Sequence, residues 1–306
     1  MIFTTYSYAL LLGVTFAVHW LLPVRARPWL LIGVSYFFYA TWRWPYLALL
    51  LLLTLFNWSY ARKVLYRADA EPGPLWPGIS VNLAVLVYFK YTNFAVENLA
   101  GLAALFGSHW TPAKLDILLP LGISFFTFQG IAYLVDVASG EEPFFNLRDF
   151  MLYKAFWPQL IAGPIIRPGE IREQLLEPRT LCYADVSSGV QRIIQGVFKK
   201  LVLADSLAVQ VDLAFPLQGA PNLLDTLAGM LGFGLQIYFD FSAYSDFAIG
   251  SARLFGFRFP ENFAWPYLAR SPQEFWNRWH MTLTRWIRDY VFTPLSFATR
   301  AQPALR

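Results

Sequence analysis

The chain has 306 residues, of which 57% are hydrophobic and only 14% charged. Soluble globular domains carry about 25% charged residues, so this composition excludes an ordinary soluble domain and indicates a membrane protein. The net charge of +4 fits a cytoplasmic loop bias better than nucleic-acid binding, and the one cysteine, Cys182, excludes an internal disulfide and a multi-thiolate metal site. We therefore expect no nucleic-acid partner and no bound metal.

The N-terminal part of the sequence predicts a series of membrane spans. Residues 4–22 form an uncharged run without the basic region and cleavage site of a signal peptide, so we expect an uncleaved span. Residues 28–60 are apolar except at 43–45, which predicts two short helices that either cross the bilayer twice or dip into it and return. The basic residues that follow these runs fall on one side, and the positive-inside rule then places the N-terminus outside the cytoplasm. These residues are Arg25, Arg27, Arg62, Lys63 and Arg67.

Further apolar runs follow along the chain, with no linker that would divide it. In residues 79–106 we expect a break near Lys90 and Asn93. Residues 150–166 are rich in proline and glycine, which predicts a broken or re-entrant segment shielded from lipid by protein. The other apolar runs are 117–137, 190–215 and 222–250. The pattern predicts an all-α polytopic membrane protein, a bundle of tilted and broken helices, with a single domain over 1–306.

Asp240 and Asp246 lie deep inside the apolar run 222–250. A charge at the bilayer centre costs about 2.5–3.5 kcal/mol, so Asp240 and Asp246 must face protein or a wet cavity. At about 100° per residue, Gln236, Asp240 and Tyr244 form one polar stripe, whereas Asp246 points elsewhere. Two interpretations stay open: these groups hydrogen-bond neighbouring helices, or they line a substrate path.

The stretch EFWNRWHMTLTRWIRDY, residues 274–290, is predicted to form one helix. Ser271 is suited to cap it, with Pro272 at the first helical position and Glu274 completing a capping box. Wound at about 100° per residue, the stretch has an aromatic arc and a polar arc. The polar arc contains two expected i,i+4 ion pairs, Glu274 with Arg278 and Arg285 with Asp289.

His280, one of 3 histidines in the chain, falls at the border between the two arcs. At this border a neutral imidazole has apolar neighbours on one side and polar partners on the other, and it could accept a proton near pH 7. The alternative is an amphipathic helix at the membrane surface, in which His280 is one more residue at headgroup level. We expect His19 and His109 to be interface or loop residues.

At these residues the sequence resembles the membrane-bound O-acyltransferase family, and in particular its bacterial branch of alginate O-acetyltransferases and teichoic-acid D-alanyl transfer proteins. The likeness extends over nearly the whole chain and is carried by LPLGISFFTFQGIAYLVDV (119–137), FWPQLIAGPIIRP (156–168), QIYFDFSAYSDFAIG (236–250) and FPENFAWPYLARSPQEFWNRWHMTLTRWIRDYVFTPL (259–295). The resemblance implies a ring of helices around a central tunnel in the bacterial inner membrane. It implies an O-acyltransferase that uses acetyl-CoA or another acyl thioester as donor substrate, with no bound cofactor.

For individual residues, the resemblance implies a histidine as general base, and His280, which matches the histidine of the family's W-x-R-W-H block, is the catalytic candidate in this chain. The resemblance also implies that the polar lumen is shaped by Asp240, Ser242, Tyr244 and Asp246, and that Trp276, Asn277, Arg278 and Trp279 line the tunnel. Asn262 and Tyr267, in the ENFAWPY turn, are interpreted as structural. The implied partners are membrane lipid, a polysaccharide or carrier acceptor such as alginate, and periplasmic acetylation proteins.

Family members are longer than this chain and carry a second, more invariant histidine in a G-L-W-H-G segment. That histidine is the one most often assigned as catalytic, and its segment is absent here. We therefore expect the chain to be truncated at its C-terminal end. Two other classes stay open on the sequence: a transporter or channel, which intramembrane carboxylates and broken helices also fit, and a non-catalytic membrane scaffold.

Overall fold

The computed structural model describes residues 3–67, 70–107, 110, 112–215 and 222–300, and these residues form helices and no strand. The all-α prediction is therefore confirmed over the described part of the chain. The helices fall into two compact units, Met1–Phe38 with Phe156–Arg306, and Tyr39–Ala155. That the whole chain forms one domain stays a prediction.

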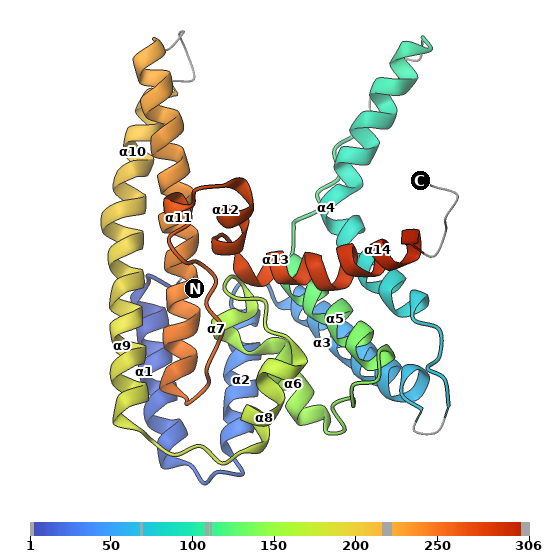
Figure 1. Ribbon diagram of the computed structural model, residues 1–306, viewed down its shortest axis with the longest axis vertical. Helices are drawn as coiled ribbons and strands as arrows, with labels where there is room; N and C mark the ends of the chain where they lie inside the picture. Colours follow the sequence, from blue (N-terminus) through green and yellow to red (C-terminus); the bar gives the residue numbers. More distant parts are fainter. Residues whose placement is uncertain (1–2, 68–69, 108–109, 111, 216–221, 301–306) are drawn as a thin grey trace. The chain divides into compact units, whose positions relative to one another are not determined.

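The first unit contains the N-terminal helices and the C-terminal half of the chain (Figure 1). Its longest element is α11, which carries the predicted carboxylates. A continuous rod made of α9, the π-helical segment η2 and α10 runs along α11 in the opposite direction. The bounds are α1 (Tyr6–Leu21), α2 (Arg27–Ala40), α7 (Trp157–Leu160), α8 (Pro168–Leu176), α9 (Tyr183–Val197), η2 (Phe198–Ala204), α10 (Asp205–Ala214), α11 (Leu223–Leu254), η3 (Pro266–Leu268), α12 (Pro272–Arg278), α13 (Met281–Ile287), η4 (Arg288–Phe292) and α14 (Thr293–Arg300).

Glycine allows α9 and α11 to approach closely. A Cβ atom on Gly250 of α11 would lie 2.7 Å from the carbonyl oxygen of Gly189, and one on Gly189 would lie 2.8 Å from the carbonyl oxygen of Gly250. Small residues at such crossings are typical of membrane helix pairs, in which packing replaces the hydrophobic effect. The close approach brings charged side chains of α9 and η2 within reach of α11.

The second unit consists of α3 (Trp44–Tyr60), η1 (Ala61–Leu65), α4 (Trp76–Leu105), α5 (Ile123–Ala138) and α6 (Leu147–Ala155). A reciprocal amide pair joins α3 to α4: Asn57 Nδ2 donates to Asn82 Oδ1 at 3.2 Å and Asn82 Nδ2 donates to Asn57 Oδ1 at 2.8 Å. Both side chains are fully buried, and Nζ of Lys154, also buried, donates to the carbonyl oxygen of Phe126. Such polar contacts hold helices together inside a membrane protein.

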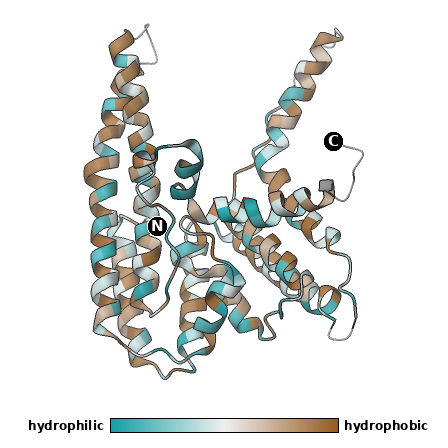
Figure 2. Cartoon of the chain, viewed as in Figure 1, coloured by the Kyte–Doolittle hydropathy of each residue, from teal (hydrophilic) through white to brown (hydrophobic). Residues whose placement is uncertain are grey.

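Two helical stretches of the described chain are long and apolar enough to cross a bilayer, Trp44–Leu65 and Trp76–Leu105. The helices α1 and α5 are apolar but shorter. Exposed apolar side chains also cover the first half of α11, and much of α10 and α11 is brown in Figure 2, whereas α12 is mostly teal. Exposed apolar surface on this scale is typical of a membrane or protein contact. The exposed residues of α11 include Leu223, Leu224, Leu227, Met230, Leu231 and Phe233.

Several sequence predictions are confirmed and one is wrong in this part of the molecule. The chain leaves the helix between α2 and α3 where Arg43 and Pro45 predicted a break, and it leaves the helix again around α7. The predicted break in 79–106 is wrong, because α4 is continuous from Trp76 to Leu105. The polar residue there, Asn93, bonds the backbone of Leu115 through both its side-chain oxygen and nitrogen, so the helix needs no interruption.

Candidate functional site

The predicted helix 274–290 is broken at its centre, next to the histidine. The helix α12 ends at Arg278 and α13 begins at Met281, with Trp279 extended and His280 in the left-handed region at φ 41°. The prediction of one continuous helix is therefore wrong. Left-handed backbone costs a non-glycine residue about 1–2 kcal/mol, so other contacts must hold it.

A neighbouring loop holds the break in place by backbone hydrogen bonds. The N–H of Ala264 donates to the carbonyl oxygen of Arg278 at 2.9 Å, and the N–H of Met281 donates to the carbonyl oxygen of Asn262 at 2.9 Å. These bonds satisfy groups that would otherwise pair within the helix. The periodicity of 274–290 cannot reveal them, because the partner segment lies outside it.

His280 lies in this bend, outside the long apolar helices, and its side chain is buried at 8% exposure. The rings of His280 and Phe241 pack edge to face, with their centroids 4.7 Å apart. Its Nδ1 lies 3.0 Å from Oδ1 of Asn262. Burial lowers the pKa of His280 from 6.5 to about 4, so the imidazole is neutral near pH 7. A neutral imidazole is the form that can accept a proton.

Asn262 links His280 to two further elements. Its Oδ1 also accepts from the hydroxyl of Thr282 at 2.9 Å, and its Nδ2 donates to Oγ of Ser245 at 3.1 Å. Asn262 is fully buried. The polar cluster therefore joins α11, the loop before η3 and α13.

A cavity of about 810 Å³ lies against this cluster. Its walls come from α9 and η2, from α11 and from the loop 261–265, and Ser242, Ser245 and Asp246 lie among its lining residues. Ser245 lines the cavity and accepts a hydrogen bond from Asn262, and Asn262 in turn contacts the imidazole of His280. Two hydrogen bonds thus connect the cavity wall to the imidazole.

Asp240 and Asp246 of α11 are both paired with cations of the neighbouring rod. Asp246, at 1% exposure, lies 2.6 Å from Arg192 Nε and 2.7 Å from Lys199 Nζ. Asp240 is more exposed and lies 2.7 Å from Lys200 Nζ. Lys199 also donates to Oγ of Ser242 at 2.8 Å. The first interpretation, that the carboxylates join helices, thus has direct contacts behind it, and Asp246 in addition lines the cavity.

The other predicted site residues lie apart from the described cavity lining. Tyr244 packs against Phe3, with ring centroids 5.8 Å apart. Trp276 and Asn277 are exposed on α12. Arg278 pairs with Glu274, and Trp279 stacks on Phe275 at 5.6 Å between centroids. The pair Glu274–Arg278 confirms one predicted ion pair, at 2.6 Å.

The start of α12 follows the prediction with one change. Oγ of Ser271 accepts the N–H of Glu274 at 3.1 Å, and Pro272 opens the helix. The Glu274 carboxylate accepts from the N–H of Arg270, at 2.8 Å, rather than from that of Ser271. The cap is confirmed, and the reciprocal half of the box is displaced by one residue.

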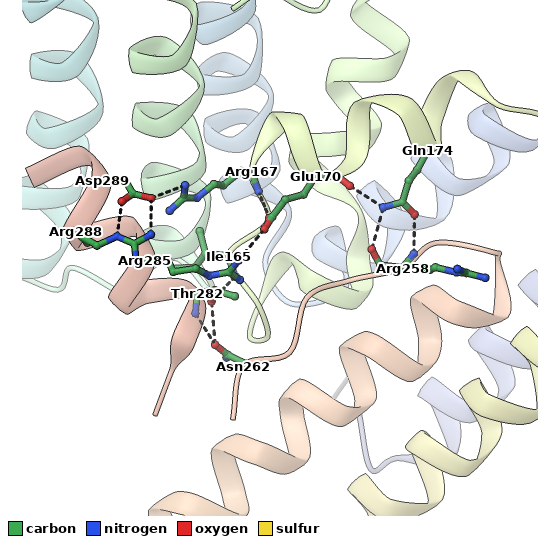
Figure 3. A network of polar contacts seen from close by, with 10 residues as sticks. All are labelled: Ile165, Arg167, Glu170, Gln174, Arg258, Asn262, Thr282, Arg285, Arg288 and Asp289. Carbon is green, nitrogen blue, oxygen red and sulfur yellow. Dashed lines mark hydrogen bonds and ion pairs between the residues drawn. The ribbon is translucent and has the colours of Figure 1, made fainter. Parts of the chain in front are cut away.

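The second predicted ion pair is wrong, because both of its residues bind the segment around α8 (Figure 3). Arg285 lies 3.4 Å from the carboxylate of Glu170, and Asp289 lies 2.8 Å from Arg167. In addition, the N–H of Ile165 donates to the hydroxyl of Thr282 at 3.0 Å. Tertiary partners thus replace the expected contacts within the helix.

Sequence reasoning missed Arg192 and Lys199 as partners of Asp246. They are seven residues apart, so they lie on one face of a helix. The sequence did contain a signal for this pairing: two cations share one face of the run 190–215, and the next apolar run, 222–250, contains a carboxylate. Asn262 carried no such signal, because its partners come from three separate segments. His19 is buried, its ring 5.1 Å from that of Phe255, rather than at an interface, and His109 lies outside the described residues.

A model of the MBOAT, membrane-bound O-acyltransferase family, matches residues 144–302. The chain is 42% identical over 301 residues to the "Probable alginate O-acetylase AlgI" of Pseudomonas putida, covering 96% of this chain and 61% of that protein. It is 35% identical over 302 residues to the "Peptidoglycan O-acetyltransferase" of Helicobacter pylori, covering 89% of this chain and 56% of that protein.

A relative matched over a shorter stretch is the "Teichoic acid D-alanyltransferase" of Streptococcus thermophilus, 36% identical over 183 residues, with 57% of this chain and 44% of that protein covered. The chain spans roughly 60% of the length of the two acetyltransferase relatives that it matches over most of its length. The names of these relatives describe an O-acetylase, an O-acetyltransferase and a D-alanyltransferase, for alginate, peptidoglycan and teichoic acid respectively.

Proposed function

Because the chain belongs to the membrane-bound O-acyltransferase family, we propose that the protein is a membrane O-acyltransferase that acetylates hydroxyl groups of an exported polysaccharide such as alginate. The observation that carries this proposal is the 42% identity, over 96% of the chain, to a probable alginate O-acetylase. The proposed donor is an acyl-CoA-type thioester.

His280 is the proposed general base. Its Nδ1 faces Asn262, which leaves Nε2 for the substrate. The acceptor hydroxyl attacks the thioester carbonyl carbon, a C–O bond forms and the C–S bond breaks. The hydroxyl proton passes to the imidazole and then to the leaving thiolate. A positioned base contributes about 10²–10⁴-fold to such a reaction.

The cavity is the proposed lumen at which donor and acceptor meet. Ser242 and Asp246 line it and supply polar groups among largely apolar walls. Holding two substrates in one site converts a bimolecular reaction into a nearly unimolecular one. A path that extends through the bilayer past Asp240, Tyr244, Trp276, Asn277, Arg278 and Trp279 stays a prediction from the resemblance.

The proposed location is the bacterial inner membrane, with several spans and the N-terminus outside. This orientation rests on Arg25 and Arg27 after the first apolar helix and on Arg62, Lys63 and Arg67 after α3. Periplasmic acetylation proteins are the proposed partners on the acceptor side, since the polymer would be modified after export.

A radioactive transfer assay tests the proposed function. The protein expressed from its native gene is reconstituted in lipid vesicles with acetyl-CoA labelled in the acetyl group and with unacetylated alginate. We expect label in the polymer, removable by mild base as an ester. Vesicles with His280→Ala should transfer little label, whereas Gln273→Ala, an exposed change on α12, should match the wild type. Absence of polymer label with alginate, peptidoglycan and teichoic acid alike would overturn the proposal.

A further inference from the structure

The side-chain amide of Asn262 is oriented by its neighbours. The backbone N–H of Thr282, which can only donate, lies 3.4 Å from one atom of the amide, so that atom is the oxygen Oδ1. On its other side Nδ2 donates to Oγ of Ser245 at 3.1 Å. The oxygen therefore points toward α13 and the nitrogen toward α11.

The hydroxyl of Thr282 strengthens this orientation. The N–H of Ile165 donates to Oγ1 of Thr282 at 3.0 Å and occupies one of its lone pairs (Figure 3). The hydroxyl proton is then directed to Oδ1 of Asn262, 2.9 Å away. A rotated amide would place its NH₂ group against the backbone N–H of Thr282, at the cost of a buried unsatisfied donor.

His280 meets this oriented oxygen through Nδ1, at 3.0 Å. An amide oxygen only accepts, so Nδ1 must carry the proton of the neutral ring. A neutral imidazole has one N–H, and Nε2 is then the bare nitrogen. The contact between Nδ1 and the amide oxygen is shielded from solvent, since Asn262 is fully buried and His280 nearly so.

We propose that Asn262 is a positioning residue that holds His280 in the Nδ1–H tautomer and so makes Nε2 its basic atom. The catalytic consequence rests on the proposed function, whereas the tautomer itself does not. Asn262 also holds the ring in place through the backbone, because its carbonyl oxygen accepts the N–H of Met281 directly after the left-handed residue.

The tautomer can be measured without any assay of activity. The protein from its native gene is labelled with ¹⁵N-histidine, reconstituted in bilayers and examined by solid-state NMR at pH 7. Loss of one set of signals in His280→Ala identifies the ring. In the wild type we expect a protonated Nδ1 and a bare Nε2. In Asn262→Ala we expect signals of the Nε2–H tautomer, and in Asn262→Asp, which keeps an acceptor in place, the wild-type pattern.

Two controls keep the spectrum interpretable. Gln273→Ala should leave the His280 signals unchanged. Unchanged signals of the other histidines in Asn262→Ala would show that the fold is retained. Asn262→Leu, which also removes the acceptor, provides the same reading if the Ala variant does not fold. An Nε2–H tautomer in the wild type, or an unchanged tautomer in both Asn262→Ala and Asn262→Leu, would overturn the proposal.

A kinetic arm separates this inference from the proposed function. If the protein transfers acetyl groups, Asn262→Ala should lower kcat at least about tenfold, within the roughly 10²–10⁴-fold that a general base contributes, with a smaller change in KM. Asn262→Asp should restore much of kcat and move the acid limb of the pH profile upward, since a carboxylate stabilises the imidazolium. An inactive wild type with the expected tautomer would overturn only the proposed function. An active wild type whose Asn262→Ala variant changes tautomer but keeps kcat would overturn the positioning role.

Discussion

Arg192 on α9 and Asp246 on α11 form an ion pair in which the arginine Nε lies 2.6 Å from the carboxylate Oδ1. Asp246 is at 1% exposure and also contacts Lys199, so two cations neutralise one buried carboxylate. This contact joins the two longest helical rods of the first unit beside the cavity that adjoins the His280 cluster.

Loss of the Asp246 carboxylate should destabilise the protein strongly. Asp246→Asn leaves two cations without their buried partner, and we expect a loss of about 3 kcal/mol in the free energy of unfolding. This is the lower end for a broken buried pair, because both cations keep partial access to their surroundings. Asp240→Asn is the matched control: its side chain is 39% exposed, so the loss should be about 1 kcal/mol or less. Unfolding midpoints in detergent measure the losses in both variants. Equal losses would contradict the assignment of Asp246 as the buried partner of two cations.

The crossing of α9 and α11 should not tolerate even one methyl group. Gly250→Ala places a Cβ 2.7 Å from the carbonyl oxygen of Gly189, and we expect a loss of about 1–3 kcal/mol, typical of overpacking. Gly13→Ala on α1, where a Cβ meets nothing within 4 Å, should leave stability nearly unchanged. Thermal unfolding of the purified variants compares them, and a tolerated Gly250→Ala would argue against the close approach.

The left-handed backbone at His280 predicts an unusual order of stability. His280→Gly should be more stable than His280→Ala by about 1 kcal/mol, because only glycine adopts φ 41° without steric cost. At the helical and exposed position Gln273 the order should reverse, with Ala more stable than Gly. Chemical denaturation of these four variants gives the two differences. An identical order at both positions would mean that residues 274–290 form a continuous helix after all.

Burial of His280 should make stability depend on pH. The folded protein keeps the imidazole neutral down to about pH 4, whereas the unfolded chain takes up a proton below about 6.5. Above pH 6.5 the imidazole is neutral in both states, so it does not change the free energy of unfolding with pH. Between pH 6.5 and 4 protonation favours the unfolded chain, and the free energy of unfolding falls by up to about 3 kcal/mol.

The variant His280→Asn isolates this dependence, because asparagine tolerates left-handed backbone and does not titrate there. The difference in unfolding free energy between wild type and variant, measured from pH 7.5 to 4.5, should shift steadily against the wild type below pH 6.5. A difference that is constant over this range would contradict a buried neutral imidazole.

Local signals in the sequence predicted local structure well. Ser271 and Pro272 marked the start of α12, Pro45 followed the break before α3, and the prolines after Phe156 marked the irregular segment around α7. Each depends on backbone chemistry within a few residues, such as a capping hydroxyl or a missing N–H, so pattern alone could identify it.

The site itself depends on contacts between distant segments, and these were predicted only in part. Helical periodicity in 274–290 could not show that the loop around Asn262 takes over the backbone bonds at the break. It placed His280 at a border between polar and apolar arcs, which agrees with a buried ring that still has a polar partner. The carboxylates Asp240 and Asp246 were recognised, whereas the cations that neutralise them were not.

The most direct test is the single-turnover rate of acetyl transfer from labelled acetyl-CoA to alginate, measured at saturating substrates for wild type, His280→Ala and Gln273→Ala. If His280 is the base, its replacement should slow the chemical step by about 10²–10⁴-fold, while Gln273→Ala transfers at the wild-type rate. A folded His280→Ala protein that transfers acetyl groups as fast as the wild type would contradict the role assigned to this imidazole.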